Sequence, residues 1–231
     1  MVLYRSVFDV PWARVRHDCD GACRRDVSCL AMATDNRPPR RPAFRDPAVL
    51  ELMGQASDPI ARLHAAHETA RVLVQTGRAG DDPATAERML ALVDEIGLST
   101  LADLWASRPP RSLPGALWRL YFIREWMRTD AAGVGRVYAA GVRFTEPNHV
   151  VAGIDPPRPE DVRRIADDIL RGAFTGDFAV ALERAAAFCA VTSAGSAELD
   201  GRDHLLRAQR LQQMSADLSA CAGLWRADSL R

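Results

Sequence analysis

The chain has 231 residues, of which 48% are hydrophobic and 26% are charged, and its formal net charge is zero. These values are typical of a globular protein and exclude wholesale disorder. A neutral chain is also poorly suited to binding nucleic-acid phosphates or anionic lipid over a broad face. Because no uninterrupted apolar run approaches the roughly 20 residues that span a bilayer, we expect no membrane segment.

The cysteines and the N-terminal pattern indicate a reducing compartment. Three of the five cysteines fall within the first thirty residues, and five cannot form an even disulfide framework. The first ten residues lack the continuous apolar run of a signal peptide. We therefore expect a cytoplasmic protein. All 30 basic residues are arginine, a bias that we attribute to a G+C-rich genome and from which no function follows.

Residues 1–45 differ from the rest of the chain. They contain clustered cysteines, paired arginines and a proline-rich stretch at 37–42, but no sustained apolar period. Such a segment has little periodic apolar surface to offset the entropy lost on ordering, so we predict a disordered, arginine- and proline-rich tail. Met32 offers an alternative translation start, which would place residues 1–31 outside the native protein. Residues 46–231 are predicted to form a single helical domain.

Three Asp-Pro pairs predict helix starts, because the aspartate can cap the helix and the proline suits its first turn. These pairs are Asp46-Pro47, Asp58-Pro59 and Asp82-Pro83. The second helix carries apolar residues at steps of three and four, and Gly77 is its predicted end. The third is predicted to end at Gly97. A short helix follows over 99–107, where Pro109 forbids extension.

The stretch 113–128 is apolar around most of a helical circumference, with only its arginines and one glutamate interrupting the pattern. A helix of this kind is buried on several sides. Four further helices are predicted, over 131–142, 159–172, 178–191 and 197–225. Extended chain is limited to 142–144 and 149–154. The pattern predicts an all-α fold, an irregular bundle of about seven to nine helices around a central apolar helix at 113–128.

His64 and His67 lie three positions apart, and Glu68 follows directly. Histidines at this spacing share a helix face and can ligate one metal ion, with Glu68 or another helix completing the shell. The pattern is not His-Glu-x-x-His, in which the two ligands lie four apart around a general base. The competing interpretation is two histidines at the edge of a helix interface.

The tail contains four soft or borderline ligands within thirteen positions. They are His17, Cys19, Cys23 and Cys29. Thiolates and imidazoles are the ligands that zinc prefers, but the spacing lacks the paired Cys-x-x-Cys pattern of a recognisable zinc site. A disordered tail without metal is the competing interpretation.

The 113–128 helix also carries arginines beside aromatic residues, a combination that can line a pocket for a small anionic or aromatic ligand. The candidate pocket residues are Arg119, Arg124, Arg128, Trp118, Tyr121 and Trp126. In the alternative interpretation, the arginine stems cover a buried helix while their charged ends reach water or acidic partners.

The sequence contains no Gly-x-Ser-x-Gly elbow, phosphate-binding loop or dinucleotide fingerprint. We therefore expect no cofactor, and enzymatic activity stays undecided with the balance against it. The leading hypothesis is a protein-interaction or regulatory module that binds a partner protein or a second copy of itself. The first alternative is a metal-assisted helical-bundle enzyme using His64, His67 and Glu68. The second is a transcription-associated nucleic-acid binder, which the acidic and uncharged residues after Gly97 disfavour.

Overall fold

The computed structural model describes residues 58–79, 83–145, 148, 152, 158–199 and 201–231, and the regular secondary structure in these ranges is helical. This confirms the predicted all-α class, with eight helices and no strand in those ranges. The helices are α3 (Pro59–Ala79), α4 (Pro83–Ile96), α5 (Leu98–Trp105), α6 (Leu113–Thr129), α7 (Ala131–Val142), α9 (Pro159–Thr175), α10 (Phe178–Ala197) and α11 (Arg202–Arg226).

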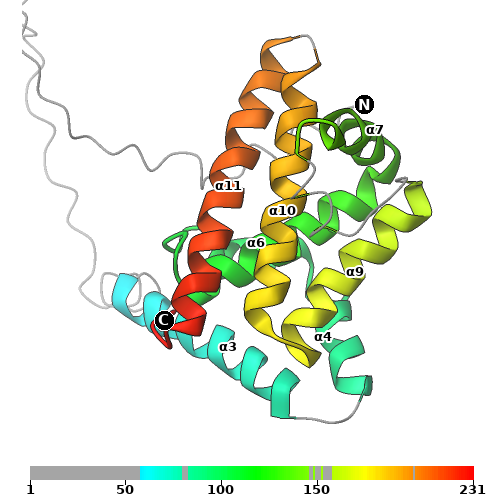
Figure 1. Ribbon diagram of the computed structural model, residues 1–231. Helices are drawn as coiled ribbons and strands as arrows, with labels where there is room; N and C mark the ends of the chain where they lie inside the picture. The colour runs from blue at the N-terminus through cyan, green and yellow to red at the C-terminus, as the bar shows by residue number, and fades with distance from the viewer. Residues whose placement is uncertain (1–57, 80–82, 146–147, 149–151, 153–157, 200) are drawn as a thin grey trace, which may run out of the picture.

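The two longest C-terminal helices, α10 and α11, form an antiparallel pair with the other helices packed around it (Figure 1). α6 crosses behind this pair, α7 and α9 lie against α10, and α3 lies beside the end at which α11 finishes. Asp177 begins α10 by accepting a hydrogen bond from the Ala179 backbone N–H at 2.9 Å. Gly201, with φ of 119°, makes the turn between the paired helices, because L residues rarely adopt this conformation.

α6 is buried around most of its circumference, as the sequence predicts. Ser112 caps it by accepting the backbone N–H of Gly115 at 3.2 Å, and Pro114 occupies its first turn. α10 is a second buried apolar helix. By length and composition α10 could cross a membrane, but 72% of the relevant window is buried inside the bundle, as in the core helix of a globular protein.

The close approach of α7 to α10 depends on two glycines. A Cβ atom at Gly141 would overlap the backbone carbonyl oxygen of Val191, and one at Gly195 would overlap that of Val137. The two backbones therefore touch directly, and the helices can cross at this distance because neither position carries a side chain. Gly133 and Gly135 of α7 are also buried.

Several predicted helix ends need correction. α3 continues past Gly77 to Ala79, because Gly77 is a packing position rather than a cap. A Cβ there would lie 2.7 Å from Cδ1 of Phe174. α9 continues to Thr175 and α10 to Ala197, so the last helix begins at Arg202 rather than at 197.

The extended chain predicted at 142–144 is also wrong. α7 runs to Val142, and a turn follows in which the Phe144 N–H donates to the carbonyl of Gly141 at 3.1 Å. Most of 149–154, the tail at 1–45, the alternative start at Met32 and the first Asp-Pro pair all lie outside the described residues. The same holds for the cysteine and histidine cluster between positions 17 and 29.

Candidate functional site

The aromatic residues of the candidate α6 pocket are parts of the hydrophobic core. Trp118, Tyr121 and Trp126 are each buried, with exposed fractions of 2%, 0% and 3%. The Tyr121 hydroxyl donates to the carbonyl of Met89 at 2.8 Å, and the Trp126 ring meets Phe188 edge-on. These contacts fix α6 against α4 and α10, so the three rings are occupied by packing.

Arg119 is buried on the side of α6 that faces α11. Its Nη1 donates to the carbonyl of Gly115 at 2.9 Å, and its Nη2 lies 3.7 Å from Oδ2 of Asp217. Asp217 also accepts a hydrogen bond from Nε of Arg111 at 3.2 Å. The guanidinium therefore joins α6 to α11 inside the bundle.

The other two candidate arginines converge on one carboxylate of α9. Nε of Arg124 donates to Oδ1 of Asp167 at 2.7 Å, and Nη1 of Arg128 lies 3.3 Å from the same oxygen. Nη2 of Arg124 lies 3.9 Å from Oδ2 of Asp94. The arginines are thus paired with acidic partners, which is the alternative interpretation that the sequence left open.

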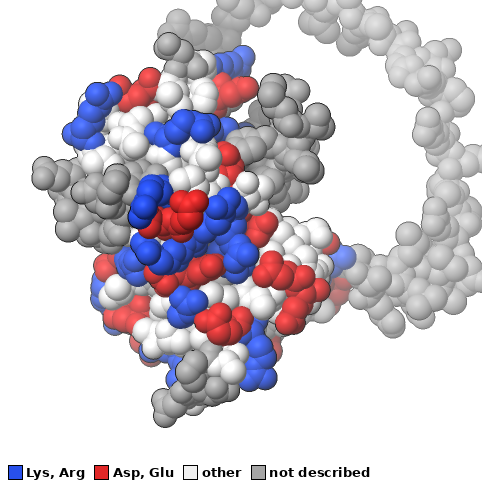
Figure 2. Space-filling model, turned by 90° about the vertical axis from the view of Figure 1, so that its right-hand side faces the viewer, with Lys and Arg blue, Asp and Glu red and all other residues white. Residues whose placement is uncertain are grey.

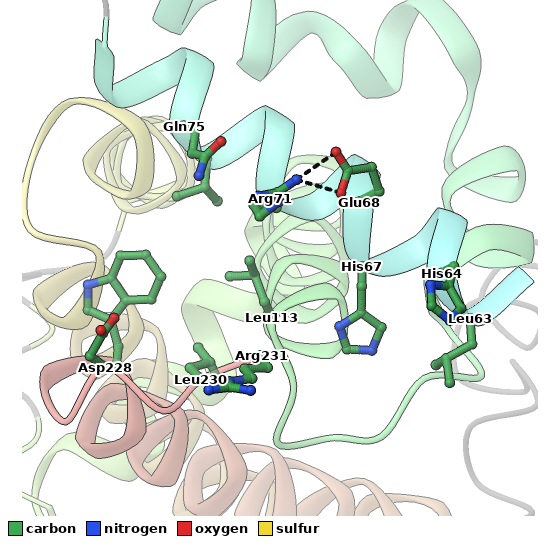
Figure 3. A pocket seen from close by; sticks show the side chains of 12 residues that line it. Leu63, His64, His67, Glu68, Arg71, Gln75, Leu113, Asp228, Leu230 and Arg231 are labelled. Atoms are coloured by element: carbon green, nitrogen blue, oxygen red, sulfur yellow. Dashed lines mark hydrogen bonds and ion pairs between the residues drawn. The ribbon is translucent and has the colours of Figure 1, made fainter. Parts of the chain in front are cut away.

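A different set of residues surrounds a groove of about 540 Å³ between α3 and the end of the chain, and we call it the α3 groove (Figure 3). It contains both histidines of the metal hypothesis and the first residue of α6, but none of the six candidate pocket residues. Its lining consists of Leu63, His64, His67, Glu68, Arg71, Val74, Gln75, Leu113, Trp225, Asp228, Leu230 and Arg231.

One wall of the groove is a single face of α3. The seven groove residues of α3 lie between Leu63 and Gln75, and each is one or three positions from the next. This spacing places them along one side of the helix. The opposite wall is the segment after α11. Asp228, at φ of 52°, turns the chain, and the backbone N–H of Leu113 donates to the carbonyl of Arg231 at 2.9 Å. This hydrogen bond holds the C-terminal segment across the start of α6.

The floor of the groove is apolar. Val74, Leu113 and Leu230 are buried, and Trp225 packs its ring 4.7 Å from that of Phe178. At the open end of α3, Leu63 remains 39% exposed. A groove with an apolar floor and a rim of charged side chains is the usual form of a binding site.

The rim is cationic around His67. This imidazole extends from α3 toward the wall formed by Leu230 and Arg231 (Figure 3). Burial lowers the pKa of His67 below its ordinary value of 6.5, and the positive charges of Arg108 and His64 lower it further. Both charged groups that act on His67 therefore favour its neutral form, which indicates a positive potential at this point of the groove.

One guanidinium nitrogen of Arg108 lacks a hydrogen-bond partner in the described part of the chain. Its Nη2 donates to the hydroxyl of Ser107 at 2.6 Å, whereas its buried Nε has no hydrogen-bond partner among the described residues. Buried polar atoms usually find a partner. Arg108 acts on His67 through its charge but does not itself line the groove.

Two of the three proposed metal ligands are available in the groove, and the third is not. His64 and His67 both line the groove, whereas Glu68 is engaged by Arg71, whose Nη2 lies 2.8 Å from each carboxylate oxygen. Within the described ranges, no group of three or more His, Cys, Asp or Glu side chains could hold a metal ion. A metal at this site would need ligands from elsewhere.

The two described cysteines are poor nucleophiles. Burial raises the pKa of Cys189 to about 12 and that of Cys221 to about 11, so both stay protonated near neutral pH. Both are core residues with no exposed surface.

No family model, curated protein or solved structure matches this chain. The α3 groove itself combines an apolar floor, two imidazoles and several guanidinium groups. The half supplied by Trp225, Asp228, Leu230 and Arg231 was missed by sequence reasoning, because no local pattern there indicates that the segment folds back onto α3. The spacing of His64 and His67 was the available signal for the other half.

Proposed function

We propose that this protein is a helical interaction module whose α3 groove binds an amphipathic, acidic helix of a partner protein. The observation that carries the proposal is the cationic rim around His67 above an apolar floor. The face of α3 from Leu63 to Gln75 is about 18 Å long, at 1.5 Å per residue, which matches a partner helix of about three turns. Helix-in-groove docking uses apolar anchors at steps of three and four along such a face.

The positive charges acting on His67 favour an acidic partner. The groove is lined by His64, His67, Arg71 and Arg231 and by two acidic residues, Glu68, which is paired with Arg71, and Asp228, so these charges balance while both histidines are neutral. Protonation of either histidine would make the rim more positive. Carboxylates on the flanks of a partner helix would then face guanidinium and imidazole groups, which raises the association rate and fixes orientation.

The nucleic-acid alternative has less support from the charge distribution. On the face shown in Figure 2, arginine side chains lie among acidic ones instead of forming a continuous basic surface. The α9 arginines illustrate this arrangement, since Arg158 and Arg164 both pair with Asp161, and Arg171 pairs with Asp168. Phosphate binding over a broad face needs unbalanced positive charge.

The test is calorimetric titration of the full chain with a synthetic helical peptide of about twelve residues, a length of roughly 18 Å. The peptide carries leucines at steps of three and four and glutamates on both flanks. A matched peptide has lysine in place of glutamate. The proposal expects the acidic peptide to bind and the basic one to bind much more weakly, with the difference decreasing as salt is added.

The variant Arg71→Glu reverses one rim charge, and Arg163→Glu is the matched control on an exposed position of α9. We expect Arg71→Glu to weaken binding of the acidic peptide about tenfold or more, and Arg163→Glu to leave its affinity unchanged. Equal binding of both peptides, or an Arg71→Glu variant that binds as tightly as the parent, would contradict the proposal. If free glutarate competes as strongly as the peptide, the site serves a small dicarboxylate and the partner-helix proposal is wrong.

A further inference from the structure

A second cavity, of about 360 Å³, lies between α7 and the first turns of α11, and we call it the α7–α11 cavity. Because α11 begins at this end of the molecule and reaches α3 at its other end, the cavity and the α3 groove lie at opposite ends of the α10–α11 pair (Figure 1). Its volume is at the lower end of the range for small-molecule sites. The two sites share no lining residue.

The cavity brings together cationic groups from two helices. Arg136 comes from α7, His204 and Arg207 come from α11, and Asp130 is the one carboxylate in the lining. With the imidazole neutral, these four side chains have a formal charge of plus one. The cavity therefore has a positive excess in a chain whose total charge is zero.

Two of these groups have unused hydrogen-bonding capacity. Arg136 is exposed, and its guanidinium, which offers five N–H donors, has no hydrogen bond or ion pair with another residue in the described ranges. The buried Nδ1 of His204 also has no partner in those ranges. By contrast, Asp130 is already used, because its carboxylate caps α7 by accepting the Gly133 N–H at 3.1 Å.

The helix ends add to the positive potential. The cavity is lined by the first two turns of α7 and by the first two turns of α11, and a helix N-terminus carries a partial positive charge. Asp130 neutralises part of this charge at α7. At α11, Gly201 makes no side-chain cap, and Arg207 adds a full charge within the first two turns.

We propose that the α7–α11 cavity binds a small phosphate-type oxyanion between the guanidinium groups of Arg136 and Arg207, with His204 as a further partner. Guanidinium forks match the oxygen geometry of phosphate and form charge-assisted hydrogen bonds with it. Because the two arginines come from separate helices, a bound anion would also tie α7 to α11.

The test uses the full chain labelled with ¹⁵N in a low-salt, phosphate-free buffer. Inorganic phosphate and glycerol phosphate are titrated separately while the backbone amide spectrum is recorded. The proposal expects saturable shifts confined to residues around the cavity, such as Gly133, Leu199 and His204. Saturation with inorganic phosphate means that the oxyanion suffices, and saturation with glycerol phosphate alone means that the ligand is an ester.

Arg136→Gln and Arg207→Gln are each expected to weaken binding about tenfold or more, since a hydrogen bond to a charged group contributes at least that factor. Arg163→Gln, on the exposed face of α9, is the matched control and should bind like the parent. Urea unfolding without phosphate shows whether each variant is folded. No saturable shift with either ligand, or equal weakening by all three substitutions, would overturn the proposal.

Discussion

Asp217 of α11 and Arg119 of α6 form an ion pair inside the bundle, with Oδ2 and Nη2 3.7 Å apart and exposed fractions of 5% and 8%. Burial lowers the pKa of Arg119, and the charge of Asp217 opposes that shift. The carboxylate therefore keeps a buried guanidinium charged where solvent cannot. This pair connects α6 to α11, the helix that leads into the α3 groove.

Removing one partner of the Arg119–Asp217 pair should lower the free energy of unfolding much more than replacing both partners. We expect Asp217→Ala to lower the free energy of unfolding by about 3 to 5 kcal/mol, because it leaves a buried, uncompensated cation. The double variant Arg119→Met with Asp217→Leu should recover a large part of that loss. Urea unfolding measures both. An Asp217→Ala variant as stable as the parent would show that the pair does not have this role.

The glycine contacts between α7 and α10 give a second prediction. Gly195→Ala should destabilise the fold by about 1 to 3 kcal/mol or more, because the new methyl group overlaps the backbone of Val137 and the helices must separate. Gly223→Ala in α11 is the control, since nothing lies within 4 Å of its added Cβ. It should stabilise the fold by about 0.5 to 1 kcal/mol through helix propensity. Thermal unfolding distinguishes the two, and equal midpoints would refute the direct backbone contact.

The imidazole of His67 should titrate below pH 6.5. In the folded chain, burial and the charges of Arg108 and His64 lower its pKa, so the unfolded chain protonates first as pH falls. The contribution of His67 to the free energy of unfolding therefore decreases as pH falls through 6.5. The imidazole proton resonances report the pKa directly. Arg108→Gln should raise it, and a pKa at or above 6.5 in the parent would contradict the positive potential in the groove.

The parts of the fold that could be predicted are those with local causes. α6 followed from its apolar residues around the whole circumference, and the starts of α3 and α4 followed from the Asp-Pro pairs. Gly77 was predicted to end a helix because glycine commonly does so. In the structure it lies against Phe174, a residue almost a hundred positions away. The sequence could not distinguish the two uses of glycine.

The candidate site was only half predictable for the same reason. His64 and His67 share a face of α3, and this spacing placed both of them correctly on one side of a helix. The wall opposite them depends on Asp228 turning the chain and on the hydrogen bond from Leu113 to Arg231. The aromatic and arginine residues of α6, suggested as a pocket, contact partners on α4, α9, α10 and α11 that no local pattern reveals.

The most direct test of the α3 groove is hydrogen exchange measured by mass spectrometry on the full chain, with and without the acidic amphipathic peptide. The account predicts slower exchange in peptides covering residues 60–75 and 224–231, the two walls of the groove, and no change across α7 and α9. Binding that leaves both walls unprotected, or protection centred on another surface, would contradict it.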